Sequence, residues 1–130
     1  MPIARGTFDV KLQPLPMEGV DGEAMLGRMS IDKQFRGDLE GTSQGQMLTV
    51  ATSTEGSAVY VAVERVTGRL GGKQGTFALH HNGTMTRGEA ALMVRIVPDS
   101  GTGELTGISG SLAIGIENDT HFYTLEYLVR

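Results

Sequence analysis

The sequence Ser57-Ala58-Val59-Tyr60-Val61-Ala62-Val63-Glu64-Arg65-Val66 is the clearest β-strand of this chain. Three valines alternate with Tyr60, Ala62 and Glu64, and this period of two residues places the two sets on opposite faces of a strand. The alternation leaves open which face is buried. If the valines form the packed layer, Glu64 lies in solvent. If both faces are covered, Glu64 lies inside, where desolvation disfavours its ionised form.

Segments with the same alternation lie on both sides of this strand. They are Thr7–Leu12, residues 25–35, residues 37–52, Gly75–His81, Glu89–Val97, Ser111–Ile116 and His121–Val129. Residues 37–52 are predicted to form one long, bulged strand or a hairpin. Two prolines and two glycines interrupt residues 13–23, which predicts a loop or a mobile flap there. None of these segments has the apolar spacing of an amphipathic helix.

The number and spacing of these strands predict an all-β fold. With 130 residues, the chain has the length of a single domain, residues 1–130, and its 19 glycines suit many tight turns. Seven to nine short strands in one antiparallel sheet must close or stack to hide their edges. We therefore predict a closed antiparallel barrel of about eight strands, of the lipocalin-like kind, with a two-sheet sandwich as the alternative. Such a barrel is filled by side chains or holds one small ligand.

Composition argues against several function classes. The chain has no cysteine, which excludes disulfides, thiol catalysis and thiolate metal sites. Its net charge of -4 is spread along the sequence, which disfavours nucleic-acid binding and a polybasic membrane anchor. The N-terminus lacks the apolar core of a secretion signal, so we expect a cytoplasmic protein without a membrane span. His80 and His81 are adjacent on a strand and His121 is distant in sequence, so we expect no metal site and no cofactor.

Four blocks of residues resemble a known family. They are Lys33-x-Phe35-x-Gly37-Asp38-Leu39-x-Gly41-x-Ser43, Tyr60-x-x-x-Glu64, Gly75-x-Phe77-x-Leu79-x-His81-x-Gly83 and Pro98-x-Ser100-Gly101-Thr102-Gly103-Glu104-Leu105. In this order they are similar to the DUF3224 family of small bacterial proteins, whose barrel is similar to that of allene oxide cyclase. The likeness runs from about Phe8 to Tyr127. It implies a barrel and a homo-oligomer, and a carboxylate-dependent peptidase or self-cleaving activity has been associated with such proteins.

Glu64 and His81 are the first candidates for chemistry. A Glu64 carboxyl inside the barrel, with a raised pKa, would act as a general acid or as a hydrogen-bond donor. His81 follows Phe77 and Leu79 on one face, which aims its ring inward near a strand end. There it would relay a proton as a neutral imidazole, or pack as a histidine bonded to backbone.

Two further carboxyl sites are candidates. Asp38 and Glu40 are two residues apart and share a strand face, where a pair of carboxyls would hold one proton near neutral pH, as in aspartic-type hydrolysis. Lys33 would offset one of these charges.

Asp99 precedes a flexible Ser100-Gly101 step and could attack its own peptide carbonyl. The alternative is an ordinary turn capped by Ser100 and Glu104.

These candidates favour one function and leave two others open. The leading hypothesis is that the barrel interior or mouth binds a small, partly apolar molecule. We predict catalytic roles for Glu64, His81, Asp38 and Asp99. We predict that the ligand is bound by Lys33, Tyr60, Ser100 and Glu104. The enzyme alternative is an aspartic-type peptidase or a self-cleaving protein that uses Asp38, Glu64 or Asp99. The third alternative is a structural module that only oligomerises.

Overall fold

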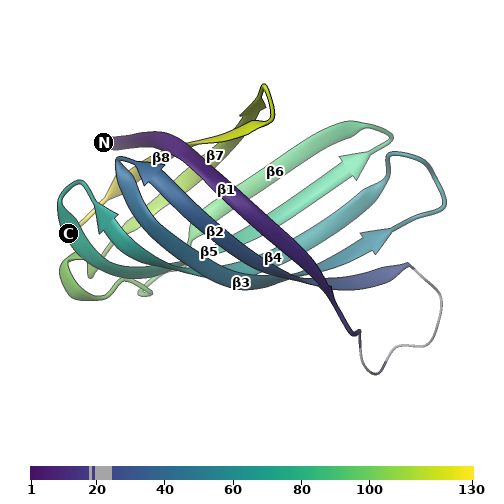
Figure 1. Ribbon diagram of the computed structural model, residues 1–130, viewed down its shortest axis with the longest axis horizontal. Coiled ribbons are helices and arrows are strands. Elements are labelled where there is room, and N and C mark those ends of the chain that lie inside the picture. The colour runs from purple at the N-terminus through teal and green to yellow at the C-terminus, as the bar shows by residue number, and fades with distance from the viewer. Residues whose placement is uncertain (18, 20–24) are drawn as a thin grey trace.

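The protein is a closed barrel of eight antiparallel strands in up-and-down order (Figure 1). The structure, a computed structural model, describes residues 1–17, 19 and 25–130. The strands are β1 (Ile3–Leu15), β2 (Leu26–Gly37), β3 (Leu39–Ala51), β4 (Ala58–Leu70), β5 (Lys73–Thr86), β6 (Glu89–Ile96), β7 (Ser109–Glu117) and β8 (Thr120–Leu128), and one 3-10 turn, η1 (Gly103–Leu105), precedes β7. The predicted fold class is therefore confirmed, and the sandwich is excluded. No helix in the described part of the chain is long and apolar enough to cross a membrane.

Strand β4 is paired on both sides. It pairs with β3 and with β5 along its whole length, from Ala58 to Leu70. Its valines 59, 61 and 63 face outward and are exposed, whereas Ala62 and Glu64 face inward and are buried. The choice that the alternation left open is thereby settled, and Glu64 lies inside the barrel.

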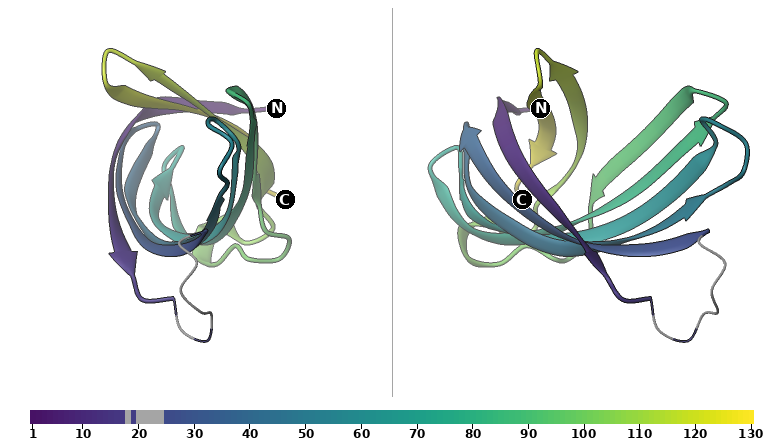
Figure 2. Two further views of the ribbon diagram at one scale, coloured as in Figure 1. Left: turned by 90° about the vertical axis from the view of Figure 1, so that its right-hand side faces the viewer. Right: turned by 45° about the vertical axis from the view of Figure 1, so that its right-hand side comes forward.

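One end of the barrel is filled by a hydrophobic core. The turns β2–β3 and β4–β5, the β6–β7 connection and both termini meet at this closed end (Figure 2). Its fully buried side chains are Phe35, Leu39, Val66, Leu70, Phe77, Leu79, Leu105, Ile108, Tyr123 and Leu125. The Tyr123 hydroxyl accepts a hydrogen bond from Leu39 N at 2.9 Å and donates to Arg36 O at 2.9 Å, so it ties β8 to the β2–β3 turn.

The glycine-rich connection between β6 and β7 covers an edge of β5. Strand β6 ends beside Leu79, and the first part of β5 has this connection as its neighbour instead. Ser100 Oγ accepts a hydrogen bond from Ala78 N at 3.0 Å, Thr102 N donates to Thr76 O at 2.8 Å, and Glu104 Oε1 accepts one from Gln74 N at 3.0 Å. The expected turn capped by Ser100 and Glu104 is thus a longer cover whose side chains satisfy the amides of another strand.

Strand β1 ends later than the sequence predicts. Strand β1 continues to Leu15, so the loop predicted over residues 13–23 begins later. Pro14 fits in this strand because β8 pairs with β1 only as far as Phe8, and a proline without an N–H is tolerated at a free edge. Within the predicted loop, residues 18 and 20–24 lie outside the described residues.

Candidate functional site

A buried ionic cluster joins four neighbouring strands inside the barrel. Lys33 of β2, Ser43 of β3, Glu64 of β4 and His81 of β5 are its members, and all four are buried. Lys33 is paired directly with Ser43 in the β2–β3 ladder. Ser43 is opposite Val66, and His81 is two residues from Leu79, the partner of Glu64. These are diagonal positions on one sheet face, which is within reach of long side chains.

Glu64 accepts three hydrogen bonds. Its Oε2 is 2.8 Å from Lys33 Nζ and 2.5 Å from His81 Nε2, and its Oε1 accepts the Ser43 hydroxyl at 2.7 Å. Burial by itself raises the pKa of Glu64, but the hydrogen bond from His81 and the charge and hydrogen bond of Lys33 outweigh burial and lower the pKa to about 2. The expectation of a raised pKa was therefore wrong. Glu64 is ionised at neutral pH and cannot act as a general acid there.

Tyr60 extends the cluster toward the open end. Its hydroxyl lies 3.3 Å from His81 Nδ1. Because an ionised carboxylate only accepts hydrogen bonds, His81 Nε2 carries a hydrogen toward Glu64, and His81 Nδ1 faces the Tyr60 hydroxyl. Burial and the nearby Glu64 charge raise the pKa of Tyr60, so its hydroxyl stays protonated. Gly83, the ladder partner of Tyr60, leaves space for this ring, because a Cβ there would collide with Tyr60 Cε1.

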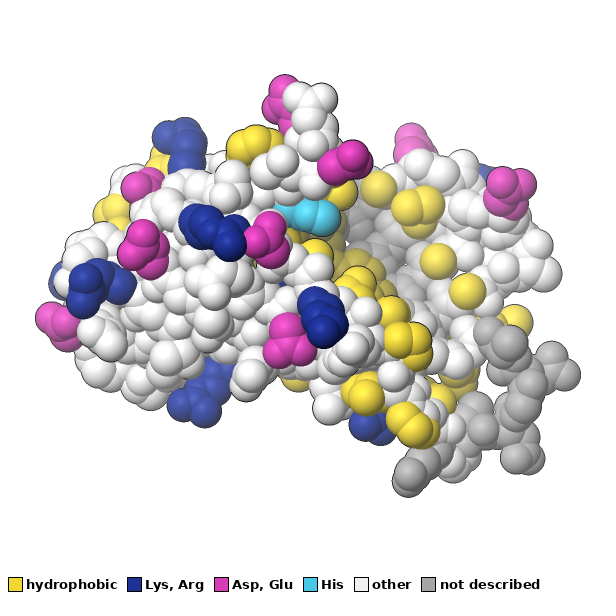
Figure 3. Space-filling view, in the orientation of Figure 1, with side chains coloured by type: hydrophobic (Ala, Val, Ile, Leu, Met, Phe, Trp, Pro, Cys, Tyr) yellow, Lys and Arg dark blue, Asp and Glu magenta, His cyan; other side chains and the backbone are white. Residues whose placement is uncertain are grey.

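The cluster forms the polar floor of an interior cavity of about 260 Å³. All eight strands contribute to its lining, which consists of Phe8, Val10, Leu12, Ile31, Lys33, Met47, Tyr60, His81, Leu92, Ile114, Ile116 and His121. Apolar side chains gather along the hollow that separates the two parts of the molecule in Figure 3. The lining includes no aspartate or glutamate, so its polar side chains are an amine, a phenol and two imidazoles.

Lys33 is held between the carboxylate and two aromatic rings. Its Nζ lies 4.9 Å from the centre of the Phe8 ring and 5.9 Å from that of Phe35, distances at which a cation is attracted to a ring face. Glu64 is its single hydrogen-bond acceptor among the described residues. An ammonium group has three N–H donors, so Lys33 retains donors for a molecule in the cavity.

The structure places the other predicted site residues elsewhere. Asp38 lies in the β2–β3 turn, not on a strand with Glu40, and its carboxylate accepts a hydrogen bond from Arg5 N at 2.8 Å. It follows β2 at the level of Leu70, six residues along β4 from Glu64, which is roughly 20 Å. Asp99, Ser100 and Glu104 belong to the β5 cover described above. Within residues 1–17, 19 and 25–130, no hydrogen bond joins two carboxyl groups and no cluster of side chains could hold a metal ion.

Ser43 and the aromatic wall around Lys33 were not predicted as site residues. The sequence places Ser43 in the same alternating segment as Asp38, but no local motif shows that its hydroxyl meets Glu64. The pairing register supplies that information, because Ser43 reaches Glu64 only through the diagonal position beside Val66. Phe8 likewise meets Lys33 because Val10, its neighbour on the same face, is the ladder partner of Lys33.

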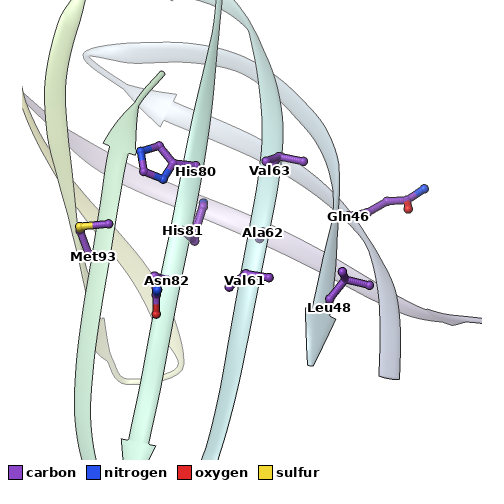
Figure 4. A pocket seen from close by; sticks show the side chains of 9 residues that line it. All are labelled: Gln46, Leu48, Val61, Ala62, Val63, His80, His81, Asn82 and Met93. Carbon is purple, nitrogen blue, oxygen red and sulfur yellow. The ribbon is translucent and has the colours of Figure 1, made fainter. Parts of the chain in front are cut away.

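A second hollow, of about 590 Å³, lies on the outer surface of β3 to β6. Figure 4 shows the side chains of Leu48 on β3, Val61 and Val63 on β4, and Met93 on β6 along it. His80 lines this outer hollow, whereas the His81 side chain is buried inside, because successive side chains of a strand point to opposite faces.

The fold and this site together define a small up-and-down β-barrel with a buried ionic cluster below an apolar cavity. Residues 4–127 match the family described as "Protein of unknown function (DUF3224)", and this chain belongs to that family. Three solved chains are similar to it. One is a protein of unknown function from the DUF3224 family of Shewanella oneidensis MR-1, with 48% sequence identity and a TM-score of 0.95 over 100% of this chain and 98% of that chain. No curated protein matches this chain. The family resemblance of the sequence is thereby confirmed.

Proposed function

We propose that this protein binds a small, largely apolar molecule inside the barrel, and that the molecule carries an oxygen acceptor such as a carbonyl or a carboxylate. The single observation that carries the proposal is the donor chain at the floor of an otherwise apolar cavity. Lys33 keeps N–H donors beside its bond to Glu64, the Tyr60 hydroxyl borders the same floor, and no acidic side chain lines the walls. A few placed polar groups in an apolar cavity are typical of ligand sites.

The size of the cavity limits the ligand. Its volume of about 260 Å³ corresponds to the space of roughly nine water molecules. This is at or below the lower end of common ligand pockets. The ligand is therefore a molecule of short chain or single ring, with its apolar part against Phe8, Met47 and Ile114.

The energetics of the cluster also support a role beyond stability. Moving Lys33 and Glu64 from water into the barrel costs desolvation energy, and apolar residues of similar volume would often stabilise such a site equally well. A buried ion pair that holds hydrogen-bond donors in fixed positions beside a cavity is instead suited to orienting a polar group. The neutral Tyr60 and ionised Glu64 provide such orientation, and they provide no acid or nucleophile for hydrolysis at neutral pH.

The proposal is tested by titrating the ¹⁵N-labelled protein with sodium octanoate and with 2-octanone while amide shifts are recorded by NMR. We expect shifts at the amides of cavity residues with at least one probe. In Tyr60→Phe the loss of one hydrogen bond should weaken binding about fivefold. Tyr127→Phe is the matched control, because Tyr127 packs at the closed end.

Two results would contradict this function. The first is that neither probe shifts the cavity amides at millimolar concentration. The second is that Tyr60→Phe and Tyr127→Phe bind the probes with equal affinity, which would show that the Tyr60 hydroxyl does not contact the ligand.

A further inference from the structure

We infer that ligands reach the cavity from the side, through the seam where β6 and β7 separate, and that closing this seam blocks their passage. The inference rests on the proposed function, because it concerns how that cavity exchanges its ligand with solvent.

The pairing of the strands shows where the wall is open. Strands β5 and β6 pair continuously from Leu79–Ile96 to Thr86–Glu89. Strands β6 and β7 share only the pair Arg95 with Ser111 in the described structure, although both continue past it toward the open end. Figure 2 shows β6 diverging from the β7–β8 hairpin above this point.

The exposure of inward-facing residues shows that the cavity reaches solvent at this seam. At its base, Val94 and Leu112 are 2% and 6% exposed. Two and four residues further along the same inner faces, Leu92 and Ile116 are 46% and 67% exposed, although both line the cavity. Side chains on the inside of a barrel become this exposed where the wall between them is missing.

A hollow on the outer side meets the same seam. It has a volume of about 320 Å³ and is lined by residues of both strands, among them Leu92, Arg95, Ser111 and Ala113. Leu92 therefore lines the outer hollow and the inner cavity. The two spaces are separated by side chains and not by a paired backbone.

The two ends of the barrel are weaker candidates for this route. The closed end is filled by Leu105, Ile108 and the aromatic core. At the open end, Met25 and Met85 are exposed, but neither lines the cavity. The two strands that border the seam, in contrast, supply three residues of the cavity lining, Leu92, Ile114 and Ile116.

A disulfide across the seam tests the inference directly. The chain has no cysteine, so two introduced cysteines can form just one disulfide. Continuing the antiparallel register from Arg95–Ser111 brings Met93 opposite Ala113, and a disulfide between them requires their Cα atoms to be about 4.4–6.8 Å apart. The oxidised variant Met93→Cys/Ala113→Cys therefore holds the seam closed. The matched control is Arg95→Cys/Ser111→Cys, which joins a pair that is already in register.

The measured quantity is the association rate of octanoate, from NMR line shapes of cavity amides, in the oxidised and the reduced form of each variant. We expect at least a tenfold slower association in oxidised Met93→Cys/Ala113→Cys, recovery on reduction, and no change in the control. Intact mass confirms the disulfide. If the two cysteines are too far apart to bond, a short bis-methanethiosulfonate reagent cross-links them across the seam and is likewise removed by reduction.

Equal rates in the oxidised and reduced forms of a closed variant would overturn the inference and place the route at the open end, while leaving the proposed function intact. Absence of octanoate and 2-octanone binding in the wild type and in every reduced variant would instead overturn the proposed function, and this inference with it.

Discussion

At Glu64, burial and hydrogen bonding act on the same carboxyl in opposite directions. Desolvation favours the protonated form, while the donors of His81, Lys33 and Ser43 favour the carboxylate. The donors prevail because they surround both oxygens within 2.8 Å. A carboxylate held in this way stabilises the folded state only while it is ionised.

We predict that Glu64→Gln destabilises the protein at neutral pH by about 3 kcal/mol, the free energy that corresponds to a pKa lowered from 4.5 to about 2. Because the folded pKa is depressed, this contribution is fully present above pH 4.5 and is lost as the pH falls toward 2. The difference in unfolding free energy between wild type and variant should therefore shrink over this interval. Urea denaturation at a series of pH values measures it.

The control for this prediction is Glu89→Gln, a change at an exposed glutamate at the start of β6. It should change the unfolding free energy by less than about 0.5 kcal/mol at every pH. If the difference in unfolding free energy between wild type and Glu64→Gln stays constant from pH 6 to pH 2, the ionised form of Glu64 does not stabilise the folded state.

The members of the site were partly predictable from single residues. Tyr60, Glu64, His81 and Lys33 were predicted as site residues and lie together in the structure. The direction of the Glu64 pKa was not predictable, because a strand pattern gives the face of a side chain and not the residues diagonal to it. Asp38 shows the same limit, because it is the single turn residue between β2 and β3 and so does not share a strand face with Glu40, although the alternation predicted that it would.

At the scale of elements, the connection between β6 and β7 replaces a missing stretch of β6. Strand β6 is shorter than β5, so the amides of Gln74, Thr76 and Ala78 have no strand partner on that side. Polar side chains of the connection act as acceptors for them: Glu104, Thr102 and Ser100. This explains why small hydroxyl residues and an acid alternate with glycines in this segment.

We predict that Ser100→Ala destabilises the protein by about 1 kcal/mol, since it removes the acceptor of the Ala78 amide. Hydrogen exchange at Ala78 should become about tenfold faster, and more so than at amides in the middle of β4. Exchange measured by NMR tests both statements. Ser53→Ala, at an exposed position of the β3–β4 turn, should leave both quantities unchanged. Uniform acceleration at all slow amides would contradict a local role of Ser100.

Strand positions were more predictable than the connections between them. Each of the eight strands overlaps a segment predicted from its alternation, because one buried face imposes the period of two residues. The β5 cover was expected to be a turn, since its glycines and hydroxyl residues also suit turns. Only the pairing partner, β5, distinguishes the two, and it is distant in sequence.

At the scale of the whole molecule, the barrel is asymmetric along its axis. One end is a hydrophobic core, the middle is an ionic cluster, and the other end is an open apolar space beside a split wall. The closure of the sheet was predictable from the number of strands in one short chain. The seam was not predictable, because the sequences of β6 and β7 both have the ordinary pattern of a strand. Their separation depends on how the β7–β8 hairpin pairs with β1.

The homo-oligomer that the family resemblance implies stays a prediction, and the outer surface of β4 is the surface we assign to it. The residues along the outer hollow include exposed Leu48, Val61, Val63 and Met93 and no lysine, arginine, aspartate or glutamate. The two copies in a symmetric contact present the same charges to each other. A strip without charged groups therefore lets a chain of net charge -4 contact its own copy without repulsion.

We therefore predict that the wild-type protein sediments at equilibrium with a mass above the 13.8 kDa of one chain. Val63→Lys introduces a like charge from each copy into the contact and should return the mass to that of one chain. Thr67→Lys makes the same change of net charge on the same outer face of β4, four residues further along, and should sediment like the wild type. A wild-type mass of one chain at every concentration, or equal masses for the two variants, would show that this strip does not join copies.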